Sequence, residues 1–168
     1  MRNAPSNSDN LIDSRDIIKR FDELHSELED RETAVTEAED AINDAKGNTV
    51  AHEETQANEE AAATLLEQLE RAQAALEDWQ ESTEGDDYGA LKKLIEQCEG
   101  YGDWSHGETL IADHYFETYA QQLADEIGAV DKQAAWPMTC IDWEQAADEL
   151  KADYTEVDYD GHTYWVRS

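Results

Sequence analysis

Basic side chains are scarce in this sequence. Its 168 residues include 12 Lys and Arg against 42 Asp and Glu, so the formal net charge is −30 at pH 7. No single acidic tail accounts for this charge. Residues 1–87 carry 25 acidic and 7 basic side chains, a net charge of −18, and residues 88–168 carry 17 and 5, a net charge of −12. Such a chain repels nucleic acid and acidic membranes. We therefore expect a basic protein surface as its partner, with no direct binding to nucleic acid or to a membrane.

Long apolar runs are also lacking. No stretch approaches the roughly 20 apolar residues that a membrane-spanning helix needs. The N-terminus lacks the apolar core of a signal peptide, so we expect a soluble, cytoplasmic protein. Cysteine is rare as well: Cys98 and Cys140 do not make a disulfide framework, and both are expected to be reduced and buried in the core.

Recognisable catalytic and cofactor motifs are missing from the sequence. There is no Gly-rich phosphate loop, no dinucleotide-binding fingerprint and no calcium-binding loop. His106 and His114 could ligate zinc together with the two cysteines, but no cysteine pair at zinc-site spacing supports this. Cys98 could act as a nucleophile with His106 and Asp103, but a core cysteine and a loop histidine explain these residues more simply. We therefore expect that the protein is not an enzyme and that it binds no cofactor and no metal.

Five Trp, seven Tyr and regularly spaced apolar residues indicate a folded chain, because disordered acidic chains rarely contain so many groups to bury. We expect disorder only over residues 1–10, the polar run MRNAPSNSDN.

Asp13 is a good N-cap for a helix over residues 13–46, and Gly47-Asn48 can end it. On both sides of this break, apolar or small residues recur at alternating spacings of four and three. The first series is Ile17, Phe21, Leu24, Leu28, Arg31, Val35, Ala38, Ile42 and Ala45; the second is Ala51, Thr55, Asn58, Ala62, Leu65, Leu69, Ala72, Leu76 and Trp79.

These two series predict an antiparallel coiled-coil hairpin of helices over residues 11–82. Folding about residue 48 pairs Ile17 with Trp79 and Arg31 with Leu65. Arg31 is expected to reach neighbouring carboxylates and to help fix the register. The pairs nearest the loop bury little, so the hairpin should be weak at its tip.

The segment STEGDDYG combines Gly, Asp and Ser, and it predicts a linker at residues 83–89. Residues 90–168 predict a small α+β domain of about three helices and a C-terminal β-hairpin. The helices are expected at ALKKLIEQC, at residues 109–128, and from Asp142 to about Lys151, where the side chain of Asp142 should cap the helix. The fold class is therefore mainly α, and α+β overall.

Asp160-Gly161 lies between two alternating runs and predicts a two-residue β-turn. This turn pairs Tyr159 with His162. The same register pairs Val157 with Tyr164 and Thr155 with Val166, so that all six side chains lie on one face. Because two strands alone are only marginally stable, that face should cover helices.

The stretch HSELEDRETAVTEAEDAIND, residues 25–44, has eight carboxylates and one guanidinium. An ordinary exposed helix gains a few tenths of a kcal/mol from each Glu–Lys pair at a spacing of four, and this stretch does without such pairs. Residues 13–82 hold 21 acidic and 6 basic side chains. At a rise of 1.5 Å per residue, this gives one net charge about every 3.4 Å of hairpin, against one per roughly 1.7 Å for duplex DNA. These carboxylates could imitate phosphates in a basic DNA-binding groove; the candidates are Glu27, Glu29, Asp30, Glu32, Glu37, Glu39, Asp40, Asp44, Glu53, Glu54, Glu59 and Glu60.

The stretch IGAV…WP…CIDWEQAADELKADYTEVDYDGHTYWVR, residues 127–167, resembles the C-terminal region of the ArdA-type antirestriction proteins of phages and mobile elements. The residues that match are Ile141, Asp142 and Trp143 at the start of a helix, Leu150 at its end, and Gly161, Tyr164 and Trp165 in the strand pair. Members of that family are acidic DNA mimics that occupy the DNA groove of type I restriction enzymes. The resemblance implies a non-enzymatic inhibitor, encoded by a phage or prophage, that blocks a host DNA-binding defence complex of the restriction-modification or CRISPR type in the host cytoplasm.

A second function fits the same sequence. The chain could be a coiled-coil adaptor or assembly protein whose acidity only keeps it soluble, including in a halophilic source. A homodimer is compatible with both functions. The two differ in their response to salt, because binding driven by charge weakens as salt rises and pairing of apolar seams does not.

Overall fold

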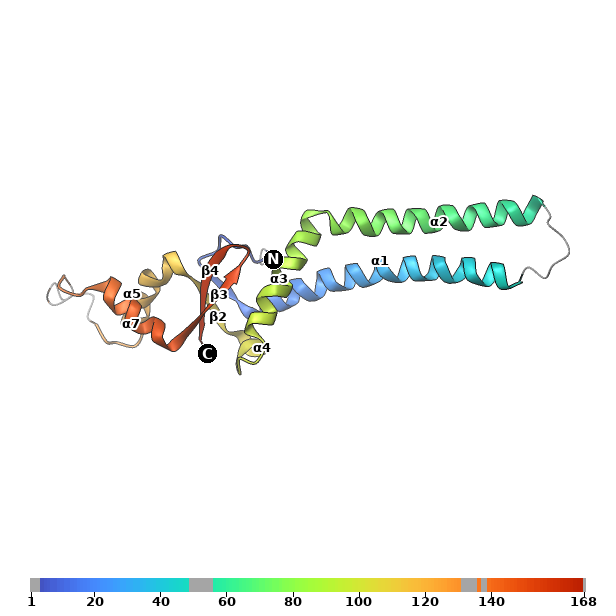
Figure 1. Cartoon of the computed structure of the whole chain (residues 1–168). Helices are drawn as coiled ribbons and strands as arrows, with labels where there is room; N and C mark the ends of the chain where they lie inside the picture. The colour runs from blue at the N-terminus through green and yellow to red at the C-terminus, as the bar shows by residue number, and fades with distance from the viewer. Residues whose placement is uncertain (1–3, 49–55, 131–135, 137–138, 168) are drawn as a thin grey trace. The chain divides into compact units, whose positions relative to one another are not determined.

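The computed structural model describes residues 4–48, 56–130, 136 and 139–167 (Figure 1). The described chain is mainly helical and contains a small antiparallel sheet of four strands. It divides into two compact units. Unit 1 comprises Met1–Phe21 and Ala90–Ser168, and unit 2 comprises Asp22–Gly89.

The longest element is α1 (Ser14–Asn48), which begins in unit 1 and continues through unit 2. The side chain of Asp13 accepts a hydrogen bond from the backbone N–H of Arg15 at 2.9 Å, so the predicted cap is confirmed. The long N-terminal helix agrees with the sequence prediction, although it continues through Gly47-Asn48. Residues 11–21 were predicted to be part of the hairpin, but they belong to unit 1. They form β1 (Leu11–Asp13) and the first turns of α1, and both are part of unit 1.

Unit 2 also contains α2 (Gln56–Gln80) and the start of α3 (Thr83–Cys98). The segment predicted as a linker at residues 83–89 is therefore helical, although the predicted boundary agrees with the division of the chain into two units after Gly89. The reason is a local cap: the hydroxyl of Ser82 accepts the backbone N–H of Gly85 at 3.3 Å and starts a new helix directly after α2. A Cβ atom at Gly85 would lie 2.6 Å from the carbonyl oxygens of Trp79 and Gln80. Glycine thus permits the tight passage between the two helices.

Contacts between α1 and α2 involve Trp79, which is buried. Its Nε1 donates to Glu27 Oε2 at 3.3 Å, and the guanidinium of Arg31 lies 5.5 Å from the centre of its ring. The predicted register, with Trp79 opposite Ile17 and Arg31 opposite Leu65, is wrong. α1 continues to Asn48 and α2 starts at Gln56, so the predicted fold point at residue 48 is still part of α1. The predicted partners at Ala51 and Thr55 lie outside the described residues.

The sheet of unit 1 has the strand order β1-β2-β4-β3, with β2 (Thr109–Ala112), β3 (Tyr154–Tyr159) and β4 (His162–Arg167). The predicted register of the C-terminal hairpin is confirmed for its three pairs: Tyr159 with His162, Val157 with Tyr164, and Thr155 with Val166. Asp160 and Gly161 both have positive φ, as a two-residue hairpin turn of this kind requires.

Both faces of this sheet bury apolar side chains. On one face, Ile111 lies opposite Trp165 and packs with α5 (Phe116–Glu126) and α7 (Trp143–Leu150). α5 and α7 contact each other beside the sheet (Figure 1). The other face carries Leu110, Val157, Tyr159, Tyr164 and Val166, all buried. Fully buried helical side chains of the same unit include Ile17 on α1, Phe116 on α5, and Leu91, Leu94 and Cys98 on α3.

Three further predictions for unit 1 need correction. The predicted helix over residues 109–128 begins as strand β2, continues as a 3₁₀ turn at Asp113–Tyr115, and becomes α-helical only at Phe116. β2 is a strand because β1 and β4, which are distant in the sequence, supply its hydrogen-bond partners on both sides. A fourth, very short helix, α4 (Trp104–Gly107), precedes β2. Cys98 is buried as predicted, but Cys140 is exposed.

The predicted disorder of residues 1–10 is wrong for Pro5–Asn10, because tertiary hydrogen bonds hold this stretch. Tyr159 donates its hydroxyl to the carbonyl of Pro5, and Tyr164 donates to the carbonyl of Asp9 at 2.6 Å. The N–H of Ala112 donates to the carbonyl of Asn10 at 2.9 Å. Two aromatic hydroxyls of the hairpin thus fix an N-terminal segment of low complexity.

Replacing Tyr164 by Ala should destabilise unit 1 by about 3 kcal/mol, because it removes a fully buried aromatic ring and its hydrogen bond to Asp9. Chemical denaturation monitored by circular dichroism measures this change. His162→Ala, at an exposed position of the same strand, is the control and should change the free energy of unfolding by less than about 0.5 kcal/mol. Equal midpoints for Tyr164→Ala and the original chain would contradict the buried position.

Candidate functional site

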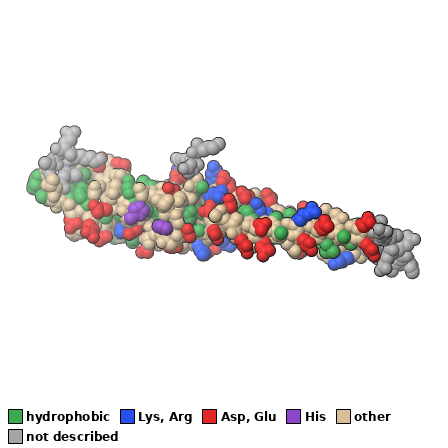
Figure 2. Space-filling view, turned by 90° about the horizontal axis from the view of Figure 1, so that it is seen from above, with side chains coloured by type: hydrophobic (Ala, Val, Ile, Leu, Met, Phe, Trp, Pro, Cys, Tyr) green, Lys and Arg blue, Asp and Glu red, His purple; other side chains and the backbone are tan. Residues whose placement is uncertain are grey.

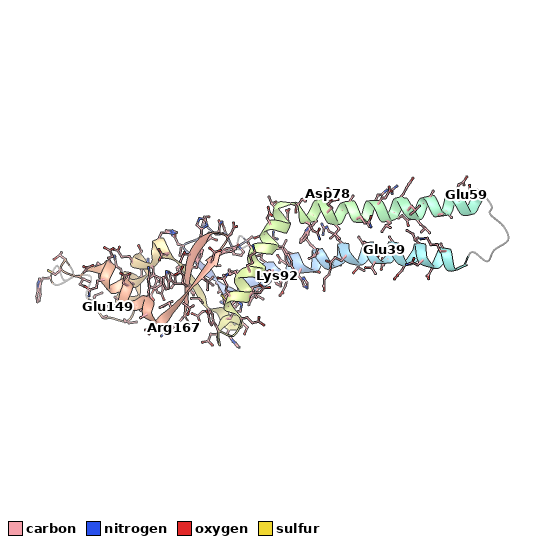
Figure 3. All side chains as sticks on the ribbon, in the orientation of Figure 1. Glu39, Glu59, Asp78, Lys92, Glu149 and Arg167 are labelled. Carbon is pink, nitrogen blue, oxygen red and sulfur yellow. The ribbon has the colours of Figure 1, made fainter. Side chains whose placement is uncertain are left out.

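The structure places ten of the twelve candidate carboxylates on the surface of unit 2. All ten are exposed, eight of them on α1 and two at the start of α2. Figure 3 labels Glu39 on α1, and Glu59 and Asp78 near the two ends of α2. The other two candidates, Glu53 and Glu54, lie outside the described residues. The ten are Glu27, Glu29, Asp30, Glu32, Glu37, Glu39, Asp40, Asp44, Glu59 and Glu60.

Unit 2 is more acidic than unit 1. Asp22–Gly89 contains 22 acidic and 3 basic side chains, a net charge of −19, whereas unit 1 contains 20 and 9, a net charge of −11. Carboxylates are spread along the face of unit 2 that Figure 2 shows. The smaller unit therefore carries most of the net charge, at the higher density.

Cations are too few in unit 2 to neutralise this surface. Arg31 donates to the backbone carbonyl of Glu27 at 2.7 Å and lies 3.7 Å from its carboxylate, and Arg71 lies 3.2 Å from the carboxylate of Glu67. The expectation that Arg31 reaches a neighbouring carboxylate is confirmed. Both are exposed pairs within one helix, and each contributes only about 0.3–0.5 kcal/mol.

The carboxylates of α1 form rows along the helix axis. Asp30, Glu37 and Asp44 are spaced by seven residues, which is close to two turns, so they lie on the same side at intervals of about 10.5 Å. Glu32 and Glu39 form a second row with the same spacing. Fixed, regularly spaced anions attract an extended array of cations.

An aromatic cluster that the sequence analysis missed joins three helices of unit 2. Nδ1 of His25 lies 3.1 Å from the hydroxyl of Tyr88, and the two rings stack with their centres 5.9 Å apart. Tyr88 also packs against Trp79, with ring centres 6.0 Å apart. Because residues 83–89 were predicted to be a linker, Tyr88 was not predicted to pack. An aromatic residue within a Gly- and Asp-rich stretch nevertheless indicates a tertiary contact of its ring.

The groups considered for zinc or nucleophilic chemistry are not assembled in the described residues. Burial raises the pKa of the Cys98 thiol to about 12, so it is a protonated core group and a poor nucleophile. His106 contacts the hydroxyl of Ser105, and His114 contacts the side chain of Asn10. Across the described ranges, no three His, Cys, Asp or Glu side chains lie together as metal ligands would.

A second cluster missed by the sequence analysis fastens α7 to the sheet of unit 1. The carboxylate of Asp113 accepts hydrogen bonds from Lys151 Nζ at 2.7 Å and from Trp165 Nε1 at 2.8 Å. The ammonium group of Lys151 also lies 4.9 Å from the ring centre of Trp165 and 5.3 Å from that of Phe116. The hydrogen bonds from Lys151 and Trp165 lower the pKa of Asp113. Every group of this cluster has a partner within it, which is typical of a structural site.

Comparisons of the chain with protein-family models, with curated proteins and with solved structures found no match. The ArdA-type resemblance therefore stays a prediction. Locally, Asp142 caps α7 by accepting the N–H of Gln145 at 3.1 Å, as the capping motif predicts, and Leu150 is the last residue of that helix. None of the described helices combines the length and the hydropathy that crossing a membrane requires.

The cluster at Asp113 predicts a stability change at acid pH. Because the folded-state pKa of Asp113 is lowered, its contribution is complete above the unfolded pKa of about 3.9 and is lost as the pH falls through the folded value. Asp113→Asn should therefore be less stable than the original chain at pH 7, by less than about 1 kcal/mol because the carboxylate is half exposed. This difference should shrink below about pH 4. Urea denaturation at several pH values tests this, with the exposed Asp148→Asn as control; a difference that does not depend on pH would contradict it.

Proposed function

We propose that this chain is an acidic DNA mimic: a non-enzymatic inhibitor, encoded by a phage or prophage, that occupies the DNA groove of a host defence complex of the restriction-modification or CRISPR type. The observation that carries the proposal is the net charge of −19 on unit 2, with ten candidate carboxylates exposed on two long helices. The class of target rests on the ArdA-type resemblance of residues 127–167.

The proposal includes an antiparallel coiled-coil hairpin of α1 and α2. The contacts of Trp79 with Glu27 and Arg31 support this pairing at one end of α2. Residues of both predicted apolar series are partly buried along the two helices, among them Leu28, Val35, Leu65 and Leu69. Pairing makes the helices stiffer than either would be alone, so their carboxylates keep a fixed spacing.

A DNA-binding groove is a suitable partner for such a surface. Its Lys and Arg side chains are arranged to neutralise a regular line of phosphates, and a line of carboxylates offers the same sign of charge at about half the density. Complementary charge also speeds the encounter between the two proteins. Since carboxylates held on helices form no base pairs, the mimic can occupy the groove without being a substrate for the complex.

The alternative function is a coiled-coil adaptor or assembly protein whose acidity keeps it soluble, including in a halophilic source. The net charge of −11 on unit 1 favours it, because acidity extends beyond the proposed mimic surface. A competition experiment distinguishes the two functions, because added DNA should displace the bound partner from a DNA mimic but not from an adaptor protein.

Distances between spin labels test the hairpin and its register. Labels at residues 26 and 80 should be close together, because they neighbour the contact between Glu27 and Trp79. Labels at residues 26 and 68 should be farther apart, since residue 68 lies about 18 Å of helix rise farther along α2. The register derived from the sequence gives the opposite order. Cys140→Ser removes the exposed native thiol, and buried Cys98 should stay unlabelled. A short distance between different chains and a long one within a chain would replace the hairpin by a swapped dimer.

Reversing Glu29, Glu32, Glu37 and Asp40 to Lys should weaken binding to the target at least about tenfold, because four attractive contacts become repulsive. Helix content should stay the same, since Lys is as good a helix former as Glu and all four side chains are exposed. The measurement is affinity capture from a bacterial lysate at low and at raised salt, with duplex DNA added as competitor.

The matched control reverses four exposed carboxylates of unit 1: Glu96, Glu99, Glu126 and Asp148. It changes the net charge by the same amount, so it separates a localised surface from overall acidity. DNA mimicry requires that the control variant still captures the partner and that DNA displaces it. Equal capture by both variants, or binding of partner and DNA together, would show that the acidic surface serves solubility.

A further inference from the structure

Strand β3 is one of the two edges of the sheet in unit 1. On its inner side it pairs with β4 along its whole length, from Tyr154 opposite Arg167 to Tyr159 opposite His162. In a hairpin with a two-residue turn, the residues next to the turn form a hydrogen-bonded pair, and such pairs alternate with pairs that are not hydrogen-bonded. Tyr159, Val157 and Thr155 therefore direct their backbone groups towards β4, and Asp158 and Glu156 direct theirs outwards.

A side chain already occupies one of these outward positions. Nε2 of Gln97, on α3, donates to the carbonyl oxygen of Asp158 at 3.0 Å, and the N–H of Asp158 donates to Oε1 of Gln97 at 2.9 Å. The carboxamide thus makes both hydrogen bonds that a residue of a neighbouring strand would make. Asp158 shows that the outward groups of β3 are oriented to pair with an additional strand.

The next outward position, two residues away along β3, is open. Among the described residues no hydrogen bond to the backbone N–H or carbonyl of Glu156 is found, and this residue is exposed. The N–H of Tyr154 is used by the carbonyl of Lys151, so Tyr154 adds only an acceptor. The open edge therefore offers one donor and two acceptors in line, beside the position that Gln97 fills.

Charge decides what fits this edge. The exposed side chains of Asp153, Glu156, Asp158 and Asp160 surround it. Opposite charges on neighbouring strands stabilise a sheet, and like charges placed directly opposite each other destabilise it. A second copy of this chain, with a net charge of −30, is therefore a poor occupant. We propose that the free edge of β3 binds an extended, Lys- or Arg-bearing segment of a partner protein, which adds a strand beside Glu156.

This surface belongs to unit 1 and is independent of the carboxylates of α1 and α2. Strand addition derives its affinity from backbone hydrogen bonds and its selectivity from alternate side chains. Only one residue of the edge offers both a donor and an acceptor, so binding should be modest. Its dependence on one backbone N–H makes it testable.

The probe is a short peptide of alternating Lys and Val, added to the full chain. Its matched control is the same peptide with every backbone amide N-methylated, which keeps the charge and removes the backbone donors. The Lys-Val peptide should bind at least about tenfold more tightly, in the range that loss of paired hydrogen bonds gives. It should also slow hydrogen exchange at the amide of Glu156. Equal binding of both peptides would overturn the proposal, because the charge of the chain alone would then account for it.

The decisive variant is Glu156→Pro. Proline removes the outward N–H and leaves the bonds between β3 and β4 intact, because Glu156 and Trp165 are not a hydrogen-bonded pair. Glu156→Val removes only the charge. The proline variant should lose the preference for the Lys-Val peptide, and the valine variant should keep it at reduced affinity. Circular dichroism checks that both variants remain folded. If the proline variant does not fold, Glu156→Thr replaces it. Threonine keeps the N–H, so the readout is then whether the Lys-Val peptide slows hydrogen exchange at the residue 156 amide. If the chain dimerises in the absence of peptide and Glu156→Pro abolishes this dimer, the edge binds a second copy of the chain and the proposal is overturned.

Discussion

The pairing of β1 with β2 is the constraint on which the rest of unit 1 depends. β1 is only three residues long, yet it joins the N-terminal segment to a sheet whose other strands come from the C-terminal half of the chain. Ser14 secures the end of this pairing: its hydroxyl donates to the carbonyl of Trp104 at 2.6 Å and accepts the N–H of Glu108 at 2.8 Å, in full burial. α1 starts at this residue, so the direction of its first turns is fixed by the sheet and not by helix propensity.

Unit 2 shows how a strongly acidic helix pair can persist. Repulsion between carboxylates opposes close packing of the helices, and few pairs at a spacing of four offset it. Stabilisation is concentrated where the charge is partly balanced: Arg31 and Glu27 meet Trp79, which packs against Tyr88. A cation over an indole ring satisfies charge and burial together. Farther along α1, the predicted seam residues Val35 and Ile42 are only partly buried, so the repulsion there is opposed by less apolar contact.

Local signals predicted local structure well. The caps at Asp13 and Asp142 and the turn at Asp160-Gly161 were predictable because each depends on residues close in sequence. The strand at Thr109–Ala112 was not, because its partners lie about 50 to 100 residues away and its apolar residues also fit a helical pattern. The register of Trp79 failed for a similar reason, since two heptad series can be paired in several ways. Of the candidate site, the exposure of the carboxylates followed from their chemistry, whereas Tyr88, Lys151 and Gln97 gained their roles only through tertiary contacts.

The two surfaces proposed here attract the same kind of partner through different physics. Carboxylates on α1 and α2 act through a field that salt screens over about 10 Å at moderate ionic strength, and that field does not depend on the orientation of the partner's backbone. The edge of β3 acts through hydrogen bonds with strict geometry, and its carboxylates only select the sign of the incoming strand. A folded basic groove can satisfy the first surface but offers no free strand to the second. A basic extended segment can satisfy the second but has no groove that matches the rows of α1. In these two proposals the acidity of the chain does not by itself define one partner, and the backbone geometry beneath the charge distinguishes the basic protein proposed for each unit.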